Sequence, residues 1–379
     1  MSLNYVNPNN VINSIRTDLL SALIQAQRAA VSVVFKTAGD LVREACTRSH
    51  FSPSVAAPLD AEPLFPFADL SHKSLVSRLT SLPAAAGLSA SGIALLADQT
   101  QLVRAFAAPD QVIERVRGTV ERIVDNFPRK AAQLECGKNP GDVMDPFLLG
   151  ATQFLLCGGS IDHSIEASVV HRSMMMLEDL VGNLHQDVLG SMRGNVRVPE
   201  PKGESWNLSD NPFPGADLAQ PPLADGEPLR FFQVKNKTGS AKGGDGKRLG
   251  DQFNILIEKY RGEVYYVAIL GKTLQGHRSM GGVLQACPQA IVSVGQTAIS
   301  QLTRSRVGGE LLLRVYQSAF RDVARAKGYT VREVATAIAL EFRQKLSGSD
   351  DDILDGILDD VTKGSISQQD SRHYPRRSK

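Results

Sequence analysis

Apolar residues recur every three to four positions through most of the first 160 residues and again after residue 286. This spacing places them on one face of a helix, so both stretches are predicted to be mainly helical. In the second stretch, residues 308–327 and 330–345 form two helical patterns joined at Gly328 and Tyr329, which fit either a helix-turn-helix or two helices of a bundle. A proline-rich break at 52–67 predicts a linker or a segment that wraps around the helices.

The middle of the chain has the pattern of a small sheet. A long apolar stripe at 163–189 indicates a helix, and the segments 196–198 and 229–237 have the sequence character of strands. A helical pattern follows at 248–260. The run 263–270 is apolar on both faces, which is typical of a central strand covered on both sides. We therefore expect an α/β fold, in which a small mixed sheet is flanked by helices and joined to a large helical elaboration.

A chain of 379 residues is long for a single module and predicts several structural parts. Hydrophobic residues make up 42% of it and charged residues 22%, so the chain can bury a sizeable core. We expect four regions in sequence order: a mainly helical region at 1–160, the sheet region at 161–285, a helical part at 286–348, and an acidic segment with a disordered basic tail at 349–379.

The composition argues against several classes of protein. The apolar runs are far shorter than the roughly 18 residues of a membrane span, and the polar first ten residues lack the apolar core of an export signal. The four cysteines are scattered without CxxC spacing, which argues against a zinc finger or a disulfide framework. These features predict a cytoplasmic protein. The net charge of +2 indicates no partner by itself.

Three polar residues of the sheet region are expected to meet. Asp217 begins one strand pattern, and Gln233 and Lys235 lie in the next. Side chains alternate along a strand, so Gln233 and Lys235 point to one face, and pairing of the two strands brings Asp217 to the same place. A carboxylate, an amide oxygen and an ammonium group are unfavourable in a hydrophobic core, but together they suit a site that binds a hard divalent cation beside a phosphate. The alternative is that Lys235 and Lys237 form the exposed face of an edge strand.

This motif resembles that of the PD-(D/E)XK nuclease superfamily and, within it, the type II restriction endonucleases. The resemblance covers residues 163–271, with 214–217 (PGAD) as the PD half and 233–235 (QVK) as the (D/E)XK half. It implies a nuclease core in the sheet region and Mg²⁺-dependent hydrolysis of DNA phosphodiester bonds. Asp217 corresponds to the first carboxylate of the family and Lys235 to its lysine.

The motif departs from the family pattern at two positions. Gln233 stands where the second acidic residue is usual, and Pro214 is separated from the acid by two residues. Because a carboxylate is lost at position 233, a compensating acid is expected from the preceding helix. Glu178 is the first choice as this metal ligand, with Asp179 second and Glu166 third. The alternative is that Glu178 and Asp179 are only solvated.

Positive charge is concentrated around the motif. Residues 228–278 contain ten basic and four acidic residues, a balance of +6 against +2 for the whole chain. This local charge predicts a surface for DNA phosphates, although a solvated basic face has the same composition. The residues expected to contact DNA are Asn236, Lys237, Lys242, Lys247 and Arg248. The glycine-rich loop at 238–247 has no lysine at the position that a P-loop requires, so no nucleotide cofactor is expected.

The function expected from the sequence is a Mg²⁺-dependent restriction endonuclease acting on double-stranded DNA. Two active sites must address the two strands of a palindrome, so a homodimer is expected. Two alternatives stay open. One is another nuclease of the same superfamily, either modification-dependent or a repair enzyme. The other is a non-catalytic DNA-binding protein that retains the fold.

Overall fold

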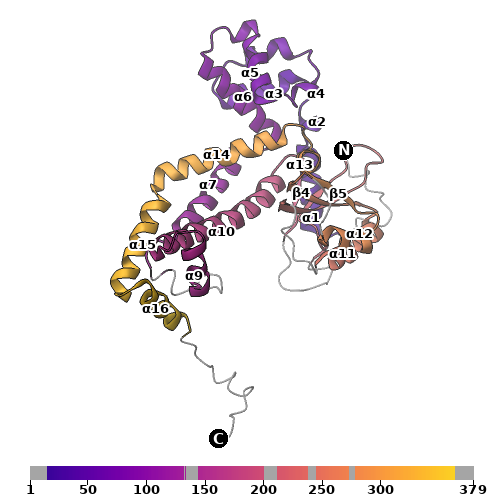
Figure 1. Cartoon of the computed structure of the whole chain (residues 1–379). Coiled ribbons are helices and arrows are strands. Elements are labelled where there is room, and N and C mark those ends of the chain that lie inside the picture. The colour runs from indigo at the N-terminus through magenta and orange to yellow at the C-terminus, as the bar shows by residue number, and fades with distance from the viewer. Residues whose placement is uncertain are drawn as a thin grey trace. The chain divides into compact units, whose positions relative to one another are not determined.

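The structure is a computed structural model, which describes residues 15–131, 133, 144–199, 211–237, 245–272 and 278–362 (Figure 1). Contacts divide the chain into two compact units. Unit 1 comprises Met1–Thr119 and Val181–Asp322, and unit 2 comprises Val120–Leu180 and Val323–Lys379. The four regions expected from the sequence stay a prediction, and the units cut across them, since the expected nuclease core at 161–285 is divided after residue 180.

Unit 1 contains a five-stranded mixed sheet in the order β1-β2-β3-β4-β5. The strands are β1 (Val196–Arg197), β2 (Leu218–Gln220), β3 (Arg230–Lys237), β4 (Glu263–Leu270) and β5 (Ile291–Val294). β1, β2 and β3 pair antiparallel, whereas β3, β4 and β5 pair in parallel. The expected α/β fold is therefore confirmed, and β4 is an internal, buried strand as its apolar sequence predicts. β5 is a correction, because only helix was expected after residue 286.

Two groups of helices complete unit 1. Those around the sheet are α1 (Thr17–Ala29), α10 (Ile161–Gly190), α11 (Asp245–Tyr260), α12 (Arg278–Ala286), α13 (Gly295–Thr303) and α14 (Gly308–Lys327). Those of the N-terminal part are α2 (Val31–Val34), α3 (Ala38–Arg48), η2 (Pro53–Leu59), α4 (Leu64–Phe67), α5 (His72–Thr80), η3 (Pro83–Ala85), α6 (Ala90–Ala105) and α7 (Pro109–Asp125). The unit boundaries fall within α7, α10 and α14.

Helices cover both faces of the sheet within unit 1. On one face, α1, α11 and α12 share a core with the strands, in which Phe231 of β3 is fully buried. α11 and α12 lie side by side (Figure 1), and a Cβ atom at Gly250 would come within 2.8 Å of the Val283 carbonyl oxygen, so this glycine permits their close approach. On the other face, Asn236 of β3 contacts His185 of α10.

The N-terminal helices form a second core of unit 1. Leu41 of α3 and Leu96 of α6 are both fully buried in it. The proline-rich segment 52–67 contributes Leu59 and Phe67 to the same core. This segment therefore wraps against the helices, and the alternative of a linker is wrong.

Unit 2 is built from helices around its own core. They are α9 (Pro146–Leu155), α15 (Val331–Leu346), α16 (Asp350–Thr362) and the adjoining parts of α7, α10 and α14. The acidic segment expected from residue 349 contains α16, in which Ile353 and Ile357 lie one turn apart and are buried in this core, while its aspartates lie at other positions of the helix. The tail at 363–379, expected to be disordered, lies outside the described residues.

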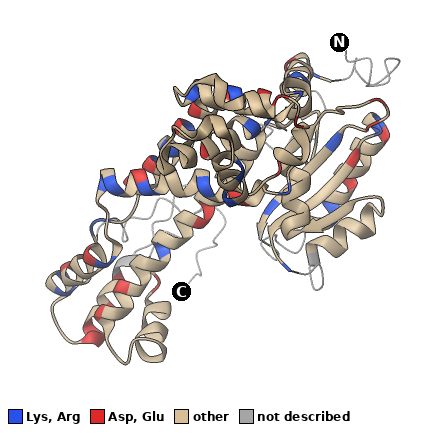
Figure 2. Ribbon diagram, turned by 90° about the horizontal axis from the view of Figure 1, so that it is seen from above, with Lys and Arg blue, Asp and Glu red and all other residues tan. Residues whose placement is uncertain are grey.

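Lysine and arginine residues are interspersed with acidic residues over both units (Figure 2), in keeping with totals of 42 basic and 40 acidic residues. In the described ranges, every helix is too short or too polar to cross a lipid bilayer.

Candidate active site

A tight turn places Asp217 at the start of β2. In the turn 213–216, the N–H of the fourth residue donates to the carbonyl oxygen of the first at 3.2 Å. Pro214 is its second residue and Gly215 its third, and Gly215 has a φ of +76°, which is the pattern of a type II turn. A Cβ atom at Gly215 would also lie 2.7 Å from Leu249 Cδ1. The glycine therefore serves both the backbone conformation and the packing of α11 against the turn.

The pairing of β2 with β3 brings Asp217 onto Gln233. The backbone N–H of Asp217 donates to the Phe232 carbonyl oxygen at 2.8 Å. Its Oδ2 accepts from the backbone N–H of Val234 at 2.7 Å and from Nε2 of Gln233 at 2.5 Å. Hydrogen bonds to an ionised acceptor are stronger than neutral ones, so these two donors hold the half-buried carboxylate in place. The predicted meeting of Asp217 and Gln233 is confirmed.

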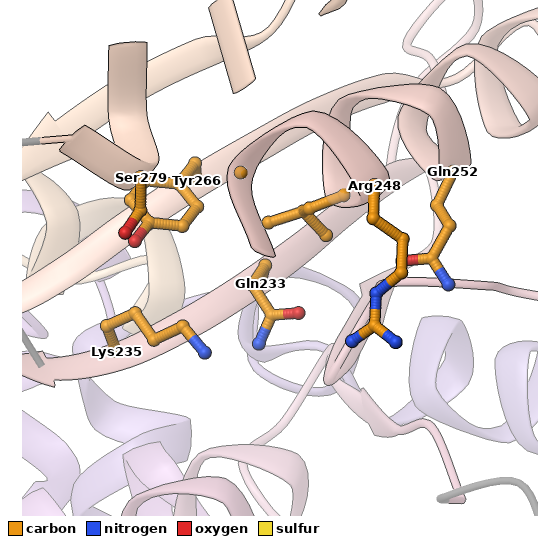
Figure 3. A pocket seen from close by; sticks show the side chains of 8 residues that line it. Gln233, Lys235, Arg248, Gln252, Tyr266 and Ser279 are labelled. Carbon is orange, nitrogen blue, oxygen red and sulfur yellow. The ribbon is translucent and has the colours of Figure 1, made fainter. Parts of the chain in front are cut away.

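Beside this contact lies a small pocket of about 80 Å³, which we call the Lys235 pocket. It is lined by Gln233, Lys235, Gly246, Arg248, Leu249, Gln252, Tyr266 and Ser279. The side chains of Lys235 and Arg248 both extend toward the amide group of Gln233 (Figure 3). The volume has room for a few water molecules or a small oxyanion group. The predicted alignment of Gln233 and Lys235 on one face of β3 is thus confirmed.

The electrostatic character of the pocket favours an anion. Among the described residues, its lining includes the cationic groups of Lys235 and Arg248 and no carboxylate. Burial raises the pKa of the Tyr266 phenol, against the opposing effect of its hydrogen bond with Ser279. Tyr266 therefore keeps its proton at neutral pH, and the charge that faces the pocket is positive.

Asn236 lies on the opposite face of β3, away from the Lys235 pocket. Its Oδ1 is 3.2 Å from Nε2 of His185, whose Nδ1 is 3.0 Å from the hydroxyl of Tyr316. Burial lowers the pKa of His185 from 6.5 to about 4, while the hydrogen bond with Asn236 acts in the other direction. This chain of polar groups was not predicted, since a single histidine on an apolar helical stripe gives no distinctive signal.

The other residues predicted for the site differ in whether they reach the Lys235 pocket. Lys247 is an exposed residue of α11 outside the pocket lining, whereas the adjacent Arg248 is part of that lining. Lys242 and the side chain of Lys237 lie outside the described residues. Glu178 is an exposed residue of α10 in unit 2, whereas the pocket belongs to unit 1, so its assignment as a metal ligand stays a prediction.

The metal-binding capacity of the described residues is limited. They contain no group of three or more His, Cys, Asp or Glu side chains that could hold an ion together. Asp217 and Gln233 supply one carboxylate and one amide group. Such a pair suits Mg²⁺, which binds proteins through one or two carboxylates and retains several waters.

No known protein-family model matches the chain, and a search of curated proteins finds no significant match. The function is therefore argued from the chemistry of the site.

Proposed function

We propose that the protein is a Mg²⁺-dependent endonuclease that hydrolyses DNA phosphodiester bonds at a specific sequence, in the manner of a restriction enzyme. The observation that carries this proposal is the 2.5 Å contact between Asp217 and Gln233 beside the pocket that Lys235 and Arg248 line. We further infer that it acts in the cytoplasm as a homodimer on double-stranded DNA.

The two cations have distinct roles in this proposal. Lys235 approaches the pocket from β3 and Arg248 from α11, so a phosphate oxygen between them is stabilised from two sides. Lys235 lies beside the contact between Asp217 and Gln233. It is the group that stabilises the negative charge that develops on the phosphoryl oxygens when water attacks. Arg248 is more exposed, and its planar guanidinium suits bidentate binding of a phosphate.

The residues present fit a Mg²⁺ ion through oxygen. Asp217 would bind it through its carboxylate, and Gln233 would have to present its amide oxygen in place of the nitrogen that now donates to Asp217. When bound, Mg²⁺ supplies polarisation of the phosphoryl group and activation of water. The protein's own contribution is to hold the carboxylate on β2 and the amide on β3 in register.

One observation favours a second candidate, a DNA-binding protein without catalysis. The Asp217 carboxylate already accepts from Gln233 and Val234, and both donors would compete with a metal ion. In that case the Lys235 pocket would bind a DNA phosphate without cleaving it.

Digestion of a sequenced plasmid with and without Mg²⁺, followed by mapping of the ends, separates these candidates. Metal-dependent discrete bands support a sequence-specific enzyme, and heterogeneous ends support a general nuclease of the same superfamily. DNA binding without cleavage at any Mg²⁺ concentration supports the non-catalytic protein. The decisive variant is Asp217→Asn, which keeps the shape of the side chain and removes the charge. It should abolish cleavage while the protein stays folded, and full activity in this variant would refute the proposed site.

A further inference from the structure

An open groove of about 650 Å³ in unit 1 shares no residue with the Lys235 pocket. It runs along the start of α13, next to the beginning of β3. The polar residues that line it include Ser32, Arg230, Thr297, Ser300, Arg304 and Arg306. We call it the arginine groove, because three guanidinium groups gather there.

In two of these arginines the buried Nε makes no hydrogen bond to the part of the chain that the structure describes. Among the described residues, neither Nε of Arg230 nor Nε of Arg304 has a hydrogen-bond partner. Arg230 Nε is 3.3 Å from Glu263 Oε2, but this contact lacks the geometry of a hydrogen bond. Arg304 uses its Nη2 to donate to the Pro221 carbonyl oxygen at 2.8 Å. A buried charged donor without a hydrogen-bond acceptor is unfavourable, so an anion bound beside these guanidinium groups would offset part of that cost.

The charges of the groove leave a positive excess. Burial and then the charge of Arg230 lower the pKa of Arg304 to about 10, with a smaller opposing effect from Glu227. Two nearby acids offset part of this charge: Glu263 Oε2 lies 3.3 Å from Arg230 Nε, and Glu227 acts on Arg304, so three guanidinium groups stand against two carboxylates. Cationic groups held close together with little exposure to solvent repel one another, and an anion bound between them reduces this repulsion.

The first turns of α13 add further donors. Thr297 and Ser300 line the groove, and the Ser300 hydroxyl accepts from Nε2 of Gln296 at 3.3 Å. Val294, the residue before the helix, provides no side-chain cap for its first N–H groups. The start of a helix carries a partial positive charge, which reinforces the preference for an anion.

We propose that the arginine groove binds a phosphate group and is separate from the site of cleavage. Arg230 and Lys235 lie five residues apart on β3, roughly 17 Å along the strand, and alternation places them on opposite faces of the sheet. The phosphate in the groove is therefore not the one that Lys235 contacts. Its source is either a free phosphorylated small molecule, such as a nucleotide, or the backbone of a bound nucleic acid.

Calorimetric titration of the full chain with inorganic phosphate tests the groove directly. The test variant combines Arg230→Gln with Arg306→Gln, and the matched control is Arg332→Gln, an exposed arginine of unit 2. The double variant should bind phosphate at least tenfold more weakly than the wild type, because charge-assisted hydrogen bonds are lost, and the control should bind as the wild type does. Equal affinity in the double variant, or no binding by the wild type, overturns the proposal. If circular dichroism shows that the double variant does not fold, Arg306→Gln alone provides the measurement, since Arg306 is exposed.

Anisotropy with a labelled DNA duplex then distinguishes the two sources. If the groove binds the nucleic-acid backbone, the double variant also binds the duplex more weakly and with a smaller dependence on salt. If the groove binds a free phosphorylated molecule, duplex affinity is unchanged and a nucleoside monophosphate binds only to the wild type and the control. The phosphate titration needs no cleavage activity, and repeating it in a Lys235→Ala background weakens any binding at the Lys235 pocket, so its result is independent of the proposed endonuclease function.

Discussion

The substitution Gln233→Glu is predicted to make the stability of the protein depend strongly on divalent metal. In the wild type, the amide of Gln233 donates to Asp217 Oδ2 at 2.5 Å, so the two side chains attract each other without a metal ion. A carboxylate at position 233 removes this donor and places two negative charges in contact. A cation between them converts the same arrangement into a ligand pair.

The size of the destabilisation caused by Gln233→Glu can be estimated from the distance between the two side chains. Two unit charges about 4 Å apart repel each other by about 4 kcal/mol at an effective dielectric constant near 20. Both side chains are half-buried, and solvent screening reduces this to about 2 kcal/mol. Loss of the hydrogen bond to a charged acceptor adds about 1 kcal/mol or more. Without metal, the variant should therefore lose about 3 kcal/mol of its free energy of unfolding. A metal ion at a hundred times its dissociation constant restores about 2.7 kcal/mol.

Urea unfolding in EDTA and across a series of Mg²⁺ concentrations measures both effects. The matched control is Gln317→Glu, which introduces the same charge at an exposed position of α14 and should show no metal dependence. Adding Asp217→Asn to Gln233→Glu leaves a single carboxylate and should recover most of the stability in EDTA. The reasoning is refuted if Gln233→Glu is equally stable in EDTA and in saturating Mg²⁺, because two adjacent carboxylates would then not share an ion.

Three further outcomes are expected. Lys235→Ala should lower the cleavage rate by about a hundredfold or more while DNA affinity is retained, and the exposed Lys73→Ala should leave both unchanged; cleavage within about tenfold of wild type would contradict the assignment. The buried His185 has its pKa lowered to about 4, so the folded state favours the neutral ring, and stability present above pH 6.5 is lost as the pH falls toward 4. Urea titrations at several pH values should show a loss on the order of 3 kcal/mol over this range that His185→Gln lacks. Gly215→Ala should lower the melting temperature more than Gly226→Ala: both glycines have positive φ, but a Cβ atom meets Leu249 only at Gly215, so equal losses would rule out a role for this contact.

Local patterns predicted the sheet and its polar contact well. The run at 263–270 is apolar on both faces because β4 is an internal strand, with β3 on one side and β5 on the other. Alternation along β3 put Gln233 and Lys235 on one face, and antiparallel pairing with β2 brought Asp217 to Gln233. These features depend on the period of the strand and on neighbouring strands, both of which can be inferred from the sequence.

Other features depend on information that local patterns do not carry. β5 has only four residues, so its β-branched residues form too short a run to stand out beside the helical pattern that follows. In α16 the aspartates conceal the spacing of Ile353 and Ile357, which are buried only because other helices of unit 2 cover them. Arg248 joins the Lys235 pocket through the packing of α11 on the sheet, which the sequence of α11 alone does not determine.

The glutamine at position 233 joins β3 to β2 through a hydrogen bond to Asp217. Two carboxylates at the β2–β3 contact would repel each other until a proton or a cation bound between them. The amide donates to Asp217 instead, and the Val234 N–H adds a second donor, so these two hydrogen bonds hold the start of β2 against β3. This arrangement has a consequence for metal binding. An ion that binds Asp217 through Oδ2 competes with the Gln233 donor, and the site offers it one carboxylate where Gln233→Glu offers two, so cleavage should require a higher Mg²⁺ concentration in the wild type than in Gln233→Glu. Cleavage rates measured against Mg²⁺ concentration for the two proteins test this order, and a lower Mg²⁺ requirement in the wild type would show that another acid, such as Glu178, completes the site.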